Sequence, residues 1–181
     1  MSRLPDGSPP GLVYRREFLS IEEESRLLAE LDGLRFDPIV MHGQPARRTA
    51  RHFGVGYDYD ARRPQSAEPL PDWLEGPRAR AAALARVEPD DLVEALAQRY
   101  PVGSTIGWHR DAPAFGRVGG ISVAGACRLR FRPVRDTKRV WEVALEPRSA
   151  YVLRGASRWS WQHSIPATKE ERYSLTFRSL R

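Results

Sequence analysis

The sequence predicts an α+β domain in which a series of strands forms a double-sheet jelly roll, with N-terminal helices packed on one sheet. Helix signals fall in the first half of the chain, and short strand patterns separated by turn residues follow Gly103. A length of 181 residues with 41% hydrophobic residues suits one core rather than several. We therefore expect a single domain over residues 12–181, after a flexible tail over residues 1–11 that is rich in Pro, Gly and Ser.

Two helices are predicted before residue 90. Ser20 is a suitable N-cap, acidic residues at 22–24 suit a first helical turn, and leucines recur at helical spacing until Gly33. An Ala-rich second helix is predicted over Pro77–Val87. Between them, residues 36–71 break into short polar and aromatic pieces, and so long a weakly apolar segment is typical of a lid over a binding site.

Strands are predicted for the rest of the chain. Asp91–Tyr100 is ambiguous, because Ala and Leu favour a helix, but we favour a strand beyond Ala95. The later strands are expected at Thr105–His109, Gly120–Val123, Cys127–Arg132, Val140–Leu145, Ala150–Leu153 and Tyr173–Arg178.

Charge and cysteine content limit the possible partners and compartment. The chain has 29 Lys+Arg against 23 Asp+Glu, all but two of the basic residues are arginine, and residues 91–181 carry the excess positive charge. Cys127 is the sole cysteine, so an internal disulfide and a Cys-rich zinc site are excluded. The sequence shows no signal peptide and no apolar stretch long enough to span a membrane. We therefore expect a cytoplasmic, monomeric protein that does not bind a membrane.

Two histidines and an aspartate form a candidate metal site. His109 and Asp111 are two residues apart on an extended segment, so they point to one face. Alone, this pair is weak evidence. His163 lies after several strands that could return it to the pair, and two His with one carboxylate is the ligand set of non-haem iron oxygenases. A packed core histidine is the alternative.

The segment Arg172–Arg178 alternates strictly between polar and apolar residues. Tyr173, Leu175 and Phe177 share one face and are expected in the core. The opposite face carries two arginines with two hydroxyl residues between them, namely Arg172, Ser174, Thr176 and Arg178. Burying such a face is costly unless an anion pairs with it, so a small dicarboxylate fits; a solvent-exposed strand is the alternative.

These segments together resemble the AlkB family of Fe(II)/2-oxoglutarate-dependent dioxygenases, from about Leu12 to the C-terminus. The specific parts are Arg-Tyr-Pro-x-Gly before Trp-His-Arg-Asp, then His-Ser-Ile-Pro, then Arg-Tyr-Ser-Leu-Thr-Phe-Arg. The resemblance implies that His109, Asp111 and His163 bind Fe(II) and carry catalysis with O2. It implies that the 2-oxoglutarate site comprises Gln98, Tyr100, Arg172, Ser174, Thr176 and Arg178. Gln98 and Ser174 replace an asparagine that the family often has, which should change the affinity and not abolish binding.

The resemblance also implies oxidative demethylation of alkylated bases in DNA or RNA, with release of formaldehyde. The base must be flipped out or taken from a single strand and held by stacking under the lid. The expected substrate contacts are Phe53, Tyr57, Tyr59, Trp108, Arg110 and Arg135, the last at a hairpin tip. Two alternatives remain open: the same chemistry on a protein or small molecule, and a nucleic-acid-binding module without catalysis.

Overall fold

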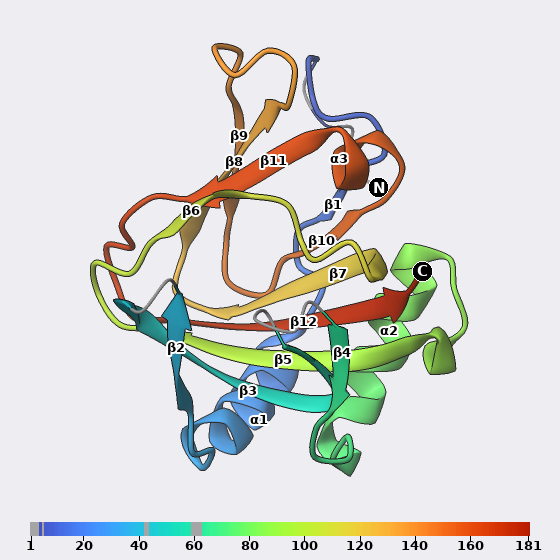
Figure 1. Cartoon of the computed structure of the whole chain (residues 1–181). Coiled ribbons are helices and arrows are strands. Elements are labelled where there is room, and N and C mark those ends of the chain that lie inside the picture. Colours follow the sequence, from blue (N-terminus) through green and yellow to red (C-terminus); the bar gives the residue numbers. More distant parts are fainter. Residues whose placement is uncertain (1–3, 5, 42–43, 59–62) are drawn as a thin grey trace.

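Two antiparallel sheets make up most of the computed structural model, which describes residue 4 and residues 6–41, 44–58 and 63–181 (Figure 1). The eight-stranded sheet runs in the order β1 (Val13–Arg15), β10 (Ala150–Leu153), β7 (Phe115–Ala124), β12 (Arg172–Leu180), β5 (Leu92–Tyr100), β3 (Gln44–Asp58) and β2 (Asp37–Met41), with β4 (Arg63–Ser66) paired to β3. The four-stranded sheet runs in the order β6 (Ile106–His109), β11 (Trp161–Ile165), β8 (Cys127–Pro133) and β9 (Trp141–Leu145). The predicted jelly roll is confirmed.

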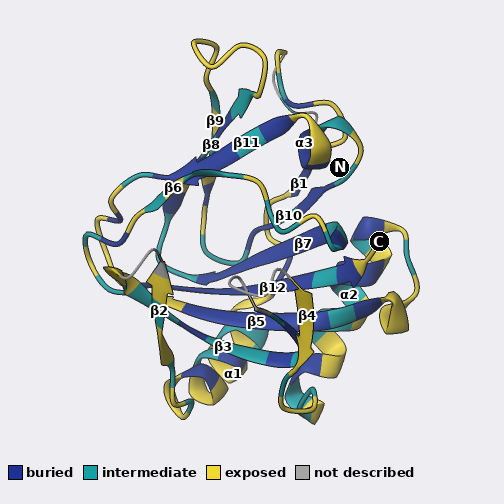
Figure 2. Ribbon diagram, viewed as in Figure 1, coloured by how far each residue is buried: buried dark blue, intermediate teal, exposed yellow. Residues whose placement is uncertain are grey.

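Both long helices cover the outer face of the large sheet. Helix α1 (Ile21–Asp32) has the predicted Ser20 cap, completed by Glu23 in a capping box. Helix α2 (Glu75–Ala85) ends at Arg86, whose φ of 58° stops the helix in the left-handed region. Their apolar side chains pack with Leu175 and Phe177 of β12 in one core. Figure 2 colours most of β12 as buried.

A second core fills the space between the two sheets. It joins residues of the small sheet, such as Leu129 and Phe131 of β8 and Trp161 of β11, to Tyr100 of β5. Strand β12 therefore lies between the two cores. Its apolar face packs against the helices, and its polar face lies in the space between the two sheets. Short connecting helices complete the chain at Asp72–Leu74, at Pro89–Asp91 and, as α3, at Ala156–Trp159.

The segment predicted as an irregular lid is mainly strand. Strand β3 pairs with β5 from Thr49 to Gly54, and it also carries β2 and β4. The polar side chains of β3 hid the strand pattern in the sequence, because ion pairs with other segments compensate their charges. Arg51, for example, pairs with Asp37 and Glu68. The sequence also failed to show β1 and β11. In the described residues no helix is long and apolar enough to cross a membrane.

Candidate active site

The small sheet brings His109 and His163 together. The two residues are register partners in the pairing of β6 with β11, and their imidazole centroids are 4.2 Å apart. His163 is buried and His109 half-buried. The Nδ1 atom of His109 is 2.9 Å from the carbonyl oxygen of Gly107, which leaves Nε2 available as a ligand atom.

Asp111 follows β6 directly and completes a three-residue cluster. One carboxylate oxygen, Oδ1, accepts hydrogen bonds from Nε and Nη2 of Arg178 at 2.9 and 2.7 Å. The other, Oδ2, is buried without a hydrogen-bond partner and lies 3.6 Å from Nε2 of His163. An unpartnered buried carboxylate oxygen beside two imidazoles is a position that a cation would satisfy.

The three side chains lie close together but are not arranged to coordinate an ion. In the described part of the chain no group of three His, Cys, Asp or Glu side chains could hold an ion as it stands. The strands β6 and β11, which carry the two histidines, are paired with these residues as register partners. The donor set, two imidazoles and one carboxylate, fits Fe(II) with open positions.

Electrostatics keeps both buried groups in the deprotonated state that a metal requires. Burial would raise the pKa of Asp111, but Arg178, His163 and His109 together hold that pKa well below its usual range. Burial lowers the pKa of His163 to about 3, and His109 acts in the same direction. At neutral pH the pair is therefore a carboxylate and a neutral imidazole.

Arg172 is a buried cation, and no ion pair joins it to a carboxylate among the described residues. Its residue is 2% exposed, its guanidinium lies 4.8 Å from the centroid of the Tyr100 ring, and its Nε and Nη1 atoms have no hydrogen-bond partner. Tyr100, its register partner on β5, donates its hydroxyl to Oε1 of Gln98 at 2.9 Å. A carboxylate between Arg172 and Tyr100 would satisfy both nitrogens.

The polar face of β12 is buried as predicted. Ser174 and Thr176 are each 5% exposed and lie opposite Gln98 and Leu96 of β5. On the other side of β12, Gly120 of β7 leaves room for an aromatic ring, since a Cβ there would stand 2.3 Å from Tyr151. These residues form the floor of the sandwich beneath the His109 cluster.

Glu94 is a site residue that the sequence analysis missed. It is 1% exposed, accepts a hydrogen bond from Nη1 of Arg178 at 2.7 Å, and lies 3.2 Å from Nδ1 of His52. Arg178 is thus held between Glu94 and Asp111, two buried carboxylates. The available signal was the alternation of β5, which puts Glu94 on the same face as Gln98 and Tyr100.

The structure places two of the expected substrate contacts away from the His109 cluster. Phe53 is 4% exposed and packs edge-on against Trp73 in the core beneath the large sheet, so it cannot stack on a base. Trp108 points away from His109, because neighbours on a strand face opposite sides. Its ring lies on the outer face of the small sheet, against Arg130 and Arg132 at 5.1 and 4.4 Å.

The other expected contacts occupy varied positions. Tyr57 is half-buried on β3, with its ring 5.9 Å from that of Phe115. Arg110 is exposed and donates to the carbonyl of Trp159, and Arg135 is exposed between β8 and β9. Tyr59 lies outside the described residues.

Comparisons with known proteins identify the family of this chain. The family model of the 2OG-Fe(II) oxygenase superfamily matches residues 11–178. A relative from Arabidopsis thaliana, "Alkylated DNA repair protein ALKBH8 homolog", is 25% identical over 187 residues, which cover 88% of this chain and 52% of the relative. The mouse "tRNA (carboxymethyluridine(34)-5-O)-methyltransferase ALKBH8" is 28% identical over 177 residues, covering 89% of this chain and 25% of the relative. The chain therefore spans about half of one curated relative and a quarter of the other.

Solved structures show the same fold. That of OsALKBH1 superposes with a TM-score of 0.73 at 18% identity, covering 94% of this chain and 97% of the other. A prolyl-4-hydroxylase from Pseudomonas putida gives a TM-score of 0.67 at 14% identity, covering 94% and 93%.

Proposed function

This chain belongs to the 2OG-Fe(II) oxygenase superfamily, and from that premise we propose that it removes alkyl groups oxidatively from bases in DNA or RNA. It is an AlkB-like dioxygenase whose family uses Fe(II), 2-oxoglutarate and O2. The observation that carries the site assignment is the cluster of His109, Asp111 and His163, together with Arg172, whose buried Nε and Nη1 atoms have no hydrogen-bond partner in the described residues.

In this proposal His109, Asp111 and His163 hold the metal. The support is the orphaned Oδ2 atom of Asp111 and the deprotonated state of His163. When bound, Fe(II) and 2-oxoglutarate supply the oxidising chemistry that converts a substrate C–H bond to C–OH. Arg178 fixes the Asp111 carboxylate through Oδ1 and leaves Oδ2 for the metal.

Arg172 and Tyr100 bind one carboxylate of 2-oxoglutarate in the same proposal. The guanidinium offers two unused nitrogens, and the Tyr100 hydroxyl is already oriented by Gln98. Ser174 and Thr176 lie next to them on β12 and line the same interior. Because these groups are buried, an anion that binds there gives up its hydrating water and gains hydrogen bonds from fixed donors in return. This exchange favours a small ligand with two negative charges.

The substrate assignment rests on charge and on relatives. Residues 91–181 hold 16 basic and 8 acidic side chains, which attract a polyanion. One relative is called an alkylated DNA repair protein homolog, and another a tRNA methyltransferase. Hydroxylation of an N-methyl group gives N–CH2OH, which breaks its C–N bond to release formaldehyde and return the N–H. Tyr57, near Phe115 at the sandwich entrance, is the aromatic proposed to stack on the base.

The test is turnover of a methylated oligonucleotide by the chain loaded with Fe(II) and 2-oxoglutarate. Succinate, formaldehyde and the restored base should form in equal amounts, and an unmethylated strand is the control. Asp111→Ala should lose metal binding in a titration, whereas Arg172→Ala should retain the metal and bind 2-oxoglutarate weakly. Succinate formation stimulated by a peptide and by no methylated nucleic acid would refute the substrate.

A further inference from the structure

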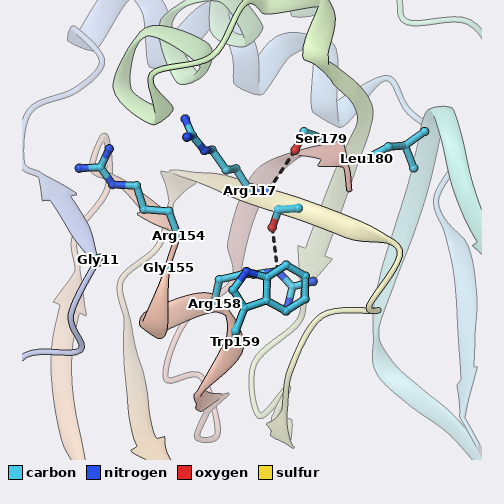
Figure 3. A pocket seen from close by; sticks show the side chains of 9 residues that line it. Gly11, Arg117, Arg154, Gly155, Arg158, Trp159, Ser179 and Leu180 are labelled. Atoms are coloured by element: carbon cyan, nitrogen blue, oxygen red, sulfur yellow. Dashed lines mark hydrogen bonds between the residues drawn. The ribbon is translucent and has the colours of Figure 1, made fainter.

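A basic cavity lies beside the loop that follows Asp111, and none of the roles given above uses it. Its volume is about 470 Å3, and its walls come from β7, the end of β12 and the segment 154–159 (Figure 3). Three of the side chains that line it are arginines: Arg117, Arg154 and Arg158. None of its nine described lining residues carries a carboxylate, so the lining is strongly cationic.

Two of the three arginines are anchored by backbone carbonyls. Arg158, which is 2% exposed, donates from Nε to Gly116 at 2.9 Å and from Nη2 to Ala112 and Phe115 at 2.8 and 2.7 Å. Arg117 donates through Nη1 to the carbonyls of Ala85 and Arg86 at the end of α2. These bonds hold both guanidinium groups in place and leave other N–H groups unused.

Arg154 differs from both neighbours. Within the residues that the structure describes, no hydrogen bond or ion pair reaches its guanidinium, although its backbone N–H is held by the hydroxyl of Ser157 at 3.1 Å. Its main chain is therefore fixed while its charge is available. A cationic side chain beside two anchored cations, without a carboxylate in the lining, is the arrangement expected of an anion receptor.

Further charges raise the potential around the cavity. Burial lowers the pKa of Arg158; Asp111, the next largest influence, raises that pKa, and Arg178 and Arg110 lower it. At the rim, the ring of Trp159 lies 4.2 Å from the Arg158 guanidinium and 5.3 Å from that of Arg181. Trp159 is 36% exposed, so it offers an apolar wall at the opening.

We propose that this cavity binds a phosphate group, and that the phosphate belongs to the nucleic-acid strand whose base enters the active site. The second part rests on the proposed function. A guanidinium group can donate two parallel hydrogen bonds to the oxygens of a phosphate. Three guanidinium groups suit the charge and tetrahedral shape of a phosphate better than they suit a single carboxylate. Arg158 donates hydrogen bonds to the carbonyls of Ala112 and Phe115, in the segment that follows Asp111, so a strand bound here passes close to the cluster of His109, Asp111 and His163.

Arg154→Gln tests the site, because that side chain makes no described contact whose loss would disturb folding. Arg26→Gln, an equal loss of charge on the exposed surface of α1, is the control. Binding of a fluorescent single-stranded oligonucleotide is measured by anisotropy at several salt concentrations. Arg154→Gln should weaken binding about three- to tenfold for every base sequence and reduce the salt slope by about 0.7, with Arg154→Glu weaker still. Succinate formation without nucleic acid should stay unchanged in all variants.

Inorganic phosphate is the second probe. It distinguishes a site for the phosphate of a nucleic-acid strand from a site for a free phosphate compound. If phosphate raises the Tm of the wild-type chain more than that of Arg154→Gln, but no oligonucleotide binds, the phosphate site stands with a free phosphate compound as its ligand, and the nucleic-acid function fails. If the oligonucleotide binds equally to wild type, Arg154→Gln and Arg26→Gln, and phosphate protects none of them selectively, the site is refuted.

Discussion

Replacement of Arg172 by methionine should stabilise the metal-free chain and remove its response to 2-oxoglutarate. The structure supplies the magnitude. Two buried guanidinium nitrogens of Arg172, Nε and Nη1, lack hydrogen-bond partners, and each unsatisfied nitrogen costs about 1–3 kcal/mol. The contact with the Tyr100 ring returns up to about 2 kcal/mol of that cost. Methionine keeps most of the volume without the charge, so Arg172→Met should raise the free energy of unfolding by about 1–3 kcal/mol.

Arg158→Met is the matched control. Arg158 has the same 2% exposure, but three carbonyl oxygens accept its hydrogen bonds. Its loss should destabilise the chain by about 3–5 kcal/mol, because the carbonyls stay buried without donors. Two arginines of equal burial are thus expected to give changes of opposite sign.

The assay is urea unfolding with and without 2-oxoglutarate in the presence of metal. A ligand at one hundred times its Kd should stabilise the wild-type chain by about 2.7 kcal/mol, and this gain should vanish in Arg172→Met. If Arg172→Met instead destabilises the metal-free chain as much as Arg158→Met does, Arg172 is a structural residue and the anion site is wrong.

Three other predictions follow from the site. Glu94→Gln should lower the free energy of unfolding by about 1–3 kcal/mol, because it removes one of the two buried carboxylates that hold Arg178; denaturant titration measures this, and no change would contradict the pairing. Trp108→Ala should leave turnover on a methylated strand within about twofold, since its ring lies on the outer face of the small sheet beside two arginines; a larger loss, measured as succinate release, would place it in the substrate path. Acid should destabilise the metal-free chain from about pH 6.5 downward. The unfolded chain gains a proton on His163 there, whereas the folded chain gains it only near pH 3, so stability rises with pH across that window; urea midpoints should fall accordingly, and His163→Asn should flatten the curve.

Strict alternation made β12 the most predictable part of the site. The polar and apolar faces of Arg172–Arg178 follow from a period of two, and the structure places both as expected. Pairing between strands is different, because no local pattern reveals it. That His163 lies opposite His109 depends on the register of β6 and β11, and the sequence supported it through resemblance.

The sequence-based predictions failed where the position of a residue depends on neighbours that are distant in the sequence. Phe53 was expected to contact the substrate because it lies in the predicted lid, but on β3 its side chain packs in the core. Glu94 was overlooked because a lone carboxylate in an apolar strand is unremarkable until Arg178 is found beside it. The strand character of β3 escaped notice because ion pairs with Asp37 and Glu68, distant in sequence, neutralise Arg51.

The pairing of β6 with β11 has a consequence for how this chain can change over generations. Because the two histidines are held by the hydrogen-bond ladder between adjacent strands, the connecting turns can gain or lose residues without separating them. A one-residue insertion inside β11 would instead rotate His163 outward and bring Gln162 or Ser164 in its place. Length variation among descendants should therefore concentrate at hairpin tips such as residues 134–139 and spare β6 and β11.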